Sequence, residues 1–348
     1  MEILENVLLS NLTTFQTGGP ARFLVTVSSE AEIPQAVEFA KTKGLPLIPI
    51  GTGSNMLAPD GGVDAVFLSI ATHITSFSTD GVSSTCTAEA GVVWDALVEE
   101  SVEKGFWGLE NLSSIPGTVG AAVVQNIGAY GSALSERVTA VDVYDTKQGK
   151  MQTLTPLECE FGYRTSIFKK EVDRYIVVRV AFSLTTNPTP NLSYRDLKNY
   201  FAHAESAPSI REVREAVIEI RKGKFPPLDV FGTAGSFFLN PIVNDEKTRE
   251  LSKMYPLMPL FPLPEGGVKL PLAWIFDHAL SLKKLRVGKA FLWEKQALVI
   301  TAERNATSGD VVSLASEVAR LVFEKTGIQI TPEVRLFGAE KKIVFENN

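Results

Sequence analysis

A serine set between a glycine and two phenylalanines is the first group in this chain that could do chemistry. It is Ser236, in the run Ala234–Phe238. A nucleophilic serine needs a histidine base, and none of the three histidines, His73, His203 and His278, lies in a recognisable triad context. The Gly-x-Ser-x-Gly motif is also missing, so a hydrolase is poorly supported. A serine hydroxyl that gives a proton to a carbanion remains open, as does a plain turn residue.

Two charged side chains in apolar surroundings are further candidates. Arg164 belongs to the run Phe161–Lys169, and a buried guanidinium is costly unless it meets a carboxylate or a phosphate. Glu333 follows Pro332, which fixes the chain beside it, and on a strand it would share a face with Arg335. Read alone, the first motif is better explained as a structural Arg–Asp pair and the second as a solvated edge pair.

Two segments rich in small residues could present backbone N–H groups to a ligand. Gly51–Asn55 follows a predicted strand and suits a phosphate nest, although it lacks both the third glycine of a dinucleotide fingerprint and the Gly-Lys-Ser/Thr of a Walker loop. It is another kind of phosphate turn or merely a tight turn. Ser113–Gly131 has almost no charge, so a flat ligand could approach its backbone closely. A buried crossover is the alternative, and we favour the ligand because large aliphatic residues are few.

Composition limits the possible partners. The chain has 348 residues, enough for two or three domains, and a net charge of −6 without a basic stripe, which argues against nucleic acid. No stretch approaches the roughly 20 apolar residues that cross a bilayer, and Met1–Thr17 carries no export signal, so we expect a cytoplasmic protein without membrane contact. Cys86 and Cys159 do not have metal-ligand spacing, so neither a disulfide scaffold nor a metal site is expected.

A cytoplasmic location would leave the glycosylation sequons unused, because glycosylation needs a secretory route. There are four of them: Asn11, Asn111, Asn191 and Asn305.

The elements that must position these groups are strands and helices mixed along the chain, which is the α+β class. Strands are predicted at 22–27, 45–50, 65–70, 85–90, 140–144, 151–154, 175–184, 297–301 and 329–337. Helices are predicted at 29–43, 94–104, 210–222, 246–254, 272–279 and 310–325. Ser29 with Glu32, and Ser209 with Glu212, have capping-box spacing. The paired prolines at 226–227 mark the best domain boundary.

The order of these motifs closely resembles the bacterial UDP-N-acetylenolpyruvoylglucosamine reductase family, also called UDP-N-acetylmuramate dehydrogenases. The resemblance runs from Thr14–Ala21 to Phe337 and is most diagnostic at 115–131, 161–169, 234–241 and 332–335. Residues 191–197 resemble the tyrosine loop of the longer subclass, which in that family closes over bound substrate.

The resemblance implies an FAD-binding fold of the vanillyl-alcohol-oxidase (PCMH) type in two subdomains, with a C-terminal α+β substrate-binding domain. Residues 1–70 with 333–348 would form the first subdomain, 71–225 the second, and 226–332 the substrate domain. It also implies non-covalent FAD, NADPH as co-substrate and a small sugar-nucleotide substrate. The implied reaction reduces UDP-N-acetylglucosamine enolpyruvate to UDP-N-acetylmuramate in peptidoglycan precursor biosynthesis. We expect a monomer without an obligate protein partner.

Roles carry over residue by residue. Ser236 matches the family's proton donor, and Arg164 and Glu333 match the pair that binds and polarises the substrate carboxylate. Positions matching the FAD site are Gly51, Thr52, Gly53, Ser54, Asn55, Ser114, Ile115, Pro116, Gly117, Gly120, Gln125, Asn126, Ile127, Gly128 and Arg335. Positions matching substrate contacts are Tyr130, Tyr194, Lys224, Asn240 and Gln296.

Two other functions compete with this one. A flavin oxidase of the same fold often attaches FAD covalently through histidine or cysteine, and neither residue type occurs in Gly51–Asn55 or Ile115–Gly131. A catalytically silent flavin or nucleotide-sugar sensor would have no reason to keep Ser236, Arg164 and Glu333 together. We rank both below the reductase.

Overall fold

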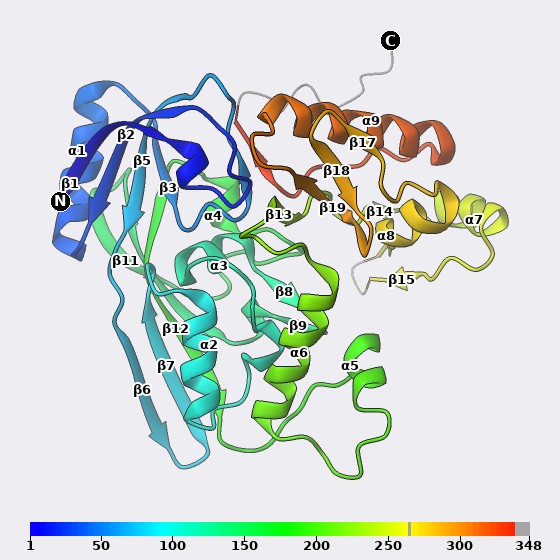
Figure 1. The fold of residues 1–348 in the computed structure, drawn as a ribbon. Coiled ribbons are helices and arrows are strands. Elements are labelled where there is room, and N and C mark those ends of the chain that lie inside the picture. Colours follow the sequence, from blue (N-terminus) through cyan, green and yellow to red (C-terminus); the bar gives the residue numbers. More distant parts are fainter. Residues whose placement is uncertain (264–265, 338–348) are drawn as a thin grey trace. The chain divides into compact units, whose positions relative to one another are not determined.

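The structure is a computed structural model that describes residues 1–263 and 266–337, and it divides into two compact units (Figure 1). The first unit contains residues 1–7, 21–52 and 64–223, and the second contains 8–20, 53–63 and the chain from 224 onward. Each unit has hydrophobic core of its own. Within the described ranges, no helix has the length and apolar character to cross a membrane.

The first unit begins with a four-stranded sheet in the order β1-β2-β5-β3. These strands are β1 (Glu2–Leu8), β2 (Pro20–Val27), β5 (Val63–Ile70) and β3 (Leu47–Ile50). Helix α1 (Ile33–Lys43) connects β2 to β3. Residues 51–62 then cross over to β5, which pairs with β3 in parallel. The helix ends at Lys43, as predicted, and Gly44 follows it in the left-handed conformation with φ +66°.

The capping box predicted at the start of this helix is wrong. Ser29 makes no side-chain cap, because a short 3-10 turn (Glu30–Glu32) precedes α1 and moves Glu32 out of the third helical position. The Glu32 carboxylate instead accepts the Ser28 N–H at 2.7 Å and pairs with the terminal amine. The second predicted box is confirmed: the Ser209 N–H donates to the Glu212 carboxylate at 2.7 Å, and Glu212 N–H donates back to the Ser209 hydroxyl at 3.3 Å.

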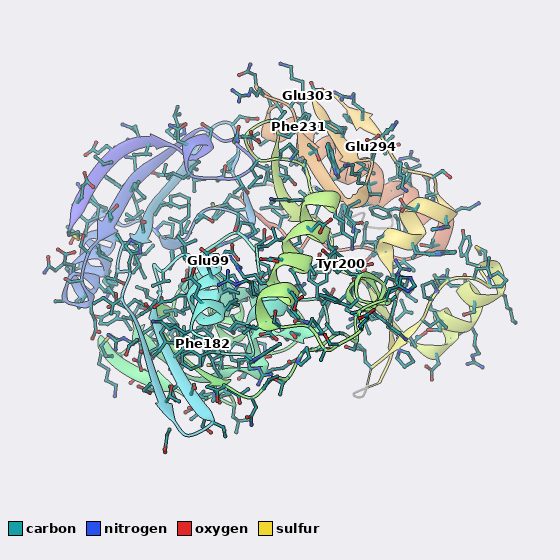
Figure 2. The ribbon with its side chains drawn as sticks, turned by 60° about the horizontal axis from the view of Figure 1, so that its bottom comes forward. Glu99, Phe182, Tyr200, Phe231, Glu294 and Glu303 are labelled. Atoms are coloured by element: carbon teal, nitrogen blue, oxygen red, sulfur yellow. The ribbon has the colours of Figure 1, made fainter. Side chains whose placement is uncertain are left out.

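An antiparallel sheet in the order β11-β10-β12-β7-β6 forms the rest of the first unit's framework. Its strands are β6 (Thr75–Asp80), β7 (Ser83–Glu89), β10 (Val138–Asp145), β11 (Lys150–Leu154) and β12 (Tyr175–Thr185). Helices α2 (Trp94–Glu103) and α6 (Ile210–Lys224) run side by side next to it (Figure 1). Trp94 meets Phe182 of β12, labelled in Figure 2, edge-on at 6.0 Å between ring centroids.

One helix in this unit lies where the sequence pattern predicts none. Helix α3 (Val119–Gln125) occupies the middle of the low-charge segment, and it is apolar apart from its last residue, so it has no polar face that would give a helical period. The Thr118 hydroxyl caps it by accepting the Ala121 N–H at 3.4 Å, and Asn126 ends it with φ +44°.

The second unit is built on the sheet β13-β19-β18-β17. Its strands are β13 (Gly232–Ser236), β19 (Gln296–Ala302), β18 (Ala290–Trp293) and β17 (Arg286–Val287). Helix α9 (Ser308–Thr326) packs on it through an apolar stripe that includes Val311, Leu314, Val318 and Val322. The smaller elements are α7 (Asp245–Met254), α8 (Leu272–Trp274), and the strands β14 (Ile242–Val243), β16 (Val268–Lys269) and β15 (Phe261–Pro262).

Two predicted elements of this unit differ from the structure. The helix predicted at 272–279 is α8 continued by a π-helical turn (Ile275–Ala279). The strand predicted at 329–337 shrinks to β20 (Arg335–Leu336), which pairs in parallel with β4 (Met56–Leu57). Pro332 has no N–H to donate into a ladder, and the chain changes partner there, so the strand on which Glu333 was expected begins only at Arg335.

A buried carboxylate fixes the turn between β10 and β11. The Asp145 side chain is inaccessible to solvent and accepts the N–H groups of Lys147 and Gln148 at 2.9 and 3.0 Å. It also accepts Gln152 Nε2 at 2.8 Å and Arg174 Nε at 3.0 Å. Burial alone would raise the pKa of Asp145, but the Gln148 N–H and the Arg174 guanidinium outweigh it and hold that pKa below the ordinary 3.8.

We therefore expect Asp145→Asn to lower the free energy of unfolding at pH 7 by about 2–3 kcal/mol. Because the folded-state pKa is lowered, this stabilisation is complete at neutral pH and disappears as the pH falls through the folded-state value below 3.8. Urea unfolding of both proteins at pH 7 and near pH 3 measures it. Asp142→Asn, on the same strand but in a partly exposed pair with Arg179, is the control and should cost less than about 1 kcal/mol. A difference that does not shrink in acid would contradict the prediction.

Candidate functional site

In the second unit, Ser236 lies at the end of β13, beyond an irregular stretch of the strand. β13 shifts register against β19 between Thr233 and Ser236, and Gly235 takes φ +74°. The Thr233 hydroxyl supports this bend, because it donates to the Ile300 carbonyl at 2.8 Å and accepts the Gly235 N–H at 3.2 Å. The bend leaves the Ser236 side chain partly exposed, and the next two residues, Phe237 and Phe238, turn into the core.

The structure brings Ser236 close to Glu333, although 96 residues separate them in the sequence. The Glu333 N–H donates to the Phe237 carbonyl at 2.8 Å, and Phe238 forms a bridge with Pro332. Ser236 and Glu333 therefore belong to adjoining stretches of paired backbone, and both side chains keep some solvent exposure.

Asn55, at the end of the glycine turn, lies next to Glu333 and Arg335. Arg335 N–H donates to the Asn55 carbonyl at 3.0 Å, and Asn55 Nδ2 donates to the Glu333 carbonyl at 3.3 Å. The Arg335 guanidinium lies over the Phe337 ring at 4.8 Å from its centroid. Asn55, Glu333 and Arg335, predicted from two motifs at opposite ends of the chain, thus form one cluster in the second unit.

Gly53 can only be glycine in this structure. Its φ is +61°, and a Cβ there would lie 2.0 Å from the Leu12 carbonyl oxygen. The Gly53 carbonyl accepts the Thr14 N–H at 3.3 Å. Because a trans peptide places C=O and N–H on opposite sides, the N–H of Ser54 points away from Thr14. The role predicted for this turn, binding the FAD pyrophosphate, stays a prediction.

In the first unit, the start of the turn packs against the low-charge segment. A Cβ on Gly51 would lie 2.8 Å from the Thr118 hydroxyl and 3.2 Å from the Ala121 methyl. The first N–H groups of α3 are already used: Val119 donates to Val92 at 2.9 Å and Gly120 donates to Ala90 at 3.0 Å. Gly120 is needed there because a Cβ would lie 2.9 Å from that of Ala90. Close packing therefore accounts for Gly120 without a ligand.

Arg164 reaches the far end of the same segment. Its Nη2 donates to the Gly128 carbonyl at 2.6 Å, and its backbone is left-handed with φ +54°. Lys169 Nζ holds this arrangement by donating to the Arg164 carbonyl and to Gln125 Oε1, both at 3.0 Å. Asn126 Nδ2 donates to the Gly162 carbonyl at 2.8 Å. The segments Ser113–Gly131 and Phe161–Lys169 are thus joined through these polar contacts.

Ionic side chains from two helices hold the start of that segment. Asp95 of α2 accepts the Ser114 N–H and a bidentate pair from Arg214 of α6 at 2.7 and 3.1 Å. Arg221 Nε donates to the Ser114 carbonyl at 3.1 Å. Burial raises the pKa of Asp95, but the Arg214 and Ser114 hydrogen bonds outweigh it and hold that pKa below the ordinary 3.8. The Ser114 backbone is left-handed, with φ +60°. Asp95 binds its N–H and Arg221 binds its carbonyl.

Tyr130 and Tyr194, predicted as substrate contacts, lie together. Their rings meet edge-on at 5.4 Å, with Tyr130 buried and Tyr194 exposed. Burial raises the pKa of Tyr130 to about 12, although the Arg221 hydrogen bond opposes this, so the phenol is neutral at pH 7. Tyr194 precedes helix α5 (Arg195–Tyr200), whose Tyr200, labelled in Figure 2, donates to Glu219 of α6 at 2.7 Å.

The other predicted substrate residues belong to the second unit. Lys224 follows directly on the part of α6 assigned to the first unit. Asn240 Oδ1 accepts the N–H of Leu272 at 3.0 Å, at the start of α8. Gln296 opens β19 opposite Trp293. Arg164, Tyr130 and Tyr194 belong to the first unit.

Comparison with known proteins follows this division. A family model described as FAD binding domain matches residues 21–155, and one described as UDP-N-acetylenolpyruvoylglucosamine reductase, C-terminal domain matches residues 226–337. Proteins named UDP-N-acetylenolpyruvoylglucosamine reductase are similar along almost the whole chain. Those of Xylella fastidiosa and Pseudomonas aeruginosa are each 36% identical, covering 96% and 97% of this chain and 96% and 99% of the relative. The one of Streptomyces coelicolor is 38% identical over 95% of this chain and 89% of its own length.

The chain belongs to the UDP-N-acetylenolpyruvoylglucosamine reductase family. The solved structure of the reductase (MurB) from Thermus caldophilus agrees with this, with a TM-score of 0.69 and 27% identity over 97% of this chain and 99% of that one. The predicted family, the FAD-binding fold class and the FAD-dependent oxidoreductase class are therefore confirmed. The predicted division into three domains and the individual residue roles stay proposals.

Several residues of this reductase that shape the site were not predicted. Asp95, Arg214 and Arg221 hold Ser114, while Asn111 and Asn191 connect Tyr130 to the tyrosine loop. The sequence offers one local signal for these residues: Asp95 is the single acidic residue in the first turn of α2. An electrostatic interaction with the helix end would explain it equally well.

Gly53→Ala tests the close approach at the glycine turn. We expect the free energy of unfolding to fall by several kcal/mol and bound FAD to be lost, because Leu12 must move to admit the methyl group. Gly81→Ala is the matched control: its φ of +60° is nearly the same, but no atom lies within 4 Å of the new Cβ, so it should cost only the roughly 1–2 kcal/mol of the left-handed backbone. Urea unfolding and flavin absorbance measure both effects. Equal losses in the two variants would contradict the role of the contact.

Proposed function

We propose that this chain catalyses the NADPH-dependent reduction of UDP-N-acetylglucosamine enolpyruvate to UDP-N-acetylmuramate in peptidoglycan precursor biosynthesis. Family membership along nearly the whole chain supports the reaction class. The observation that carries the proposal is the hydrogen bond from the Glu333 N–H to the Phe237 carbonyl, because it joins the segments of a candidate proton donor and a candidate carboxylate partner in one unit.

Bound FAD, once reduced by NADPH, would supply the hydride for the terminal carbon of the enolpyruvyl group. Negative charge then builds on the other alkene carbon and spreads into the substrate carboxylate, so the site must stabilise that charge and deliver a proton. Ser236 gives its hydroxyl proton to this carbon. Its place after a strand bend, followed by the buried Phe237 and Phe238, fixes the Ser236 backbone before the substrate arrives.

Arg164 and Glu333 bind and polarise the substrate carboxylate. The Arg164 guanidinium is preorganised by the Gly128 carbonyl, and its planar shape suits a planar carboxylate. Tyr130, Tyr194, Lys224, Asn240 and Gln296 hold the sugar nucleotide.

The flavin is held without a covalent bond. Gly51, Thr52, Gly53, Ser54 and Asn55 would hold the pyrophosphate of bound FAD, and Arg335 and the segment from Ser114 to Gly128 would each contribute to binding the isoalloxazine. The left-handed turn at Gly53 and the hydrogen bonds from Ser114 to Asp95 and Arg221 support this assignment, because both hold backbone groups in fixed orientations.

The proton-donor role predicts that Ser236→Ala separates the two half-reactions. Flavin reduction by NADPH should stay nearly intact, while reoxidation by the enolpyruvyl sugar nucleotide should fall by many orders of magnitude, beyond the roughly 10²–10⁴-fold usually credited to general acid catalysis. Stopped-flow absorbance of the flavin measures each half. Ser252→Ala, on α7 of the same unit, is the control and should change neither. An equal loss in both halves would refute the role.

Tyr194→Phe should raise the KM for the sugar nucleotide about five- to tenfold with little change in kcat, since it removes one hydroxyl contact to bound substrate. Tyr200→Phe, six residues later, removes only the hydrogen bond to Glu219 and should leave KM unchanged. Steady-state kinetics decide, and an unchanged KM in Tyr194→Phe would mean that the loop has another role.

A further inference from the structure

We infer that Asn111 is a positioning residue that tethers the tyrosine loop, residues 191–197, to the turn at Tyr130. No sequence motif links Asn111 to the candidate substrate residues. In the sequence it stands out only as part of a glycosylation sequon that a cytoplasmic protein would not use. The inference rests on the proposed function, in which Tyr194 contacts the bound sugar nucleotide.

The tether is a single buried amide. Asn111 is 1% exposed, and its Nδ2 donates to the Tyr130 carbonyl and to the Asn191 carbonyl, each at 2.8 Å. Both acceptors are carbonyl oxygens, so the amide nitrogen must face them. One side chain therefore satisfies two backbone groups that are 61 residues apart in sequence, one on the buried Tyr130 turn and one on the tyrosine loop.

Asn191 returns contacts in the opposite direction. Its Nδ2 donates to the Gly131 carbonyl at 3.0 Å, and its Oδ1 accepts the Ser193 hydroxyl at 2.7 Å and the Ser193 N–H at 3.2 Å. Tyr130 and Gly131 have φ +48° and +83°, so two successive left-handed residues turn their carbonyls toward the two asparagines. Asn111 and Asn191 thus fix the backbone next to both rings of the Tyr130–Tyr194 contact.

Packing alone does not explain an asparagine at position 111. In the part of the chain that the structure describes, Asn111 Oδ1 is buried and receives no hydrogen bond. A buried carbonyl oxygen without a donor is unfavourable, and an apolar residue of similar size would avoid it. The two N–H donors are therefore what this position requires.

The rest of the loop has its own anchors. Leu197 is buried with Ala216 and Val217, and Tyr200 donates to Glu219. Loss of the Asn111 amide should therefore loosen residues 191–194 while leaving α5 in place.

Asn111→Asp tests the tether, because it replaces the two donors by an oxygen of the same shape that faces two carbonyl oxygens. We expect hydrogen–deuterium exchange in peptides covering 187–197 to become at least about tenfold faster, with peptides from β10 and β12 unchanged. Asn187→Asp, an exposed residue just before the loop, is the matched control and should change nothing. If Asn111→Asp does not fold, Asn111→Ala removes the same two donors without placing an oxygen against the carbonyls and should give the same local increase.

Kinetics separate a positioning role from a structural one. In Asn111→Asp, the KM for the enolpyruvyl sugar nucleotide should rise about tenfold, while flavin reduction by NADPH stays unchanged. In a Tyr194→Ala background the Asn111 change should add no further increase, because its effect acts through Tyr194.

Unchanged exchange in a folded Asn111 variant would overturn the tether. Faster exchange with an unchanged KM, or an effect on KM that persists without Tyr194, would overturn the positioning role. Failure of the wild-type protein to reduce the sugar nucleotide would instead refute the proposed function, and the exchange experiment distinguishes the two because it needs neither substrate nor flavin chemistry.

Discussion

The second unit depends on a close approach in which residues 12–15 pass between two glycine backbones. A Cβ on Gly53 would lie 2.0 Å from the Leu12 carbonyl oxygen, and one on Gly232 would lie 2.0 Å from that of Phe15. Between them, Thr14 donates its N–H to Gly53 at 3.3 Å, accepts the Thr233 N–H at 3.0 Å and donates its hydroxyl to the Thr233 carbonyl at 2.6 Å. The glycine turn and the strand that ends in Ser236 are therefore fixed to the same short segment, so a displacement of either would be felt by the other.

Aromatic packing continues this constraint to the catalytic candidates. Phe15 meets Phe237 at 6.3 Å, Phe237 meets Phe238 at 5.1 Å, and Phe238 meets Phe276 at 6.2 Å. Burying one such ring stabilises a fold by about 1.5–3 kcal/mol, so the two residues after Ser236 hold the serine in place far more strongly than its own hydrogen bonds could. The Phe237 carbonyl is also the acceptor for Glu333. The same apolar anchors thus set the positions of both polar groups.

In the first unit, the segment Ser113–Gly131, proposed to bind the flavin, has almost no charge of its own. Charged residues elsewhere hold it: Asp95 and Arg221 bind the two backbone groups of Ser114, and Lys169 binds Gln125. Arg214 neutralises Asp95 through two hydrogen bonds and is itself almost buried. A neutral segment of small residues is therefore held in a fixed conformation by charged side chains from outside it.

The sequence by itself determined the features that depend on neighbouring residues: the end of α1 at Lys43, the Ser209–Glu212 capping box, most of the strands, and the ordered motifs that identify the family. The tertiary structure decided which distant groups meet. Helix α3 has no polar face to reveal it, and the strand before Arg335 is cut short where Pro332 cannot donate. The partners of Asp95 and Asn111 lie up to 119 residues away, with no local trace. Local patterns report interactions within about four residues, whereas such pairings are selected only when the whole core packs.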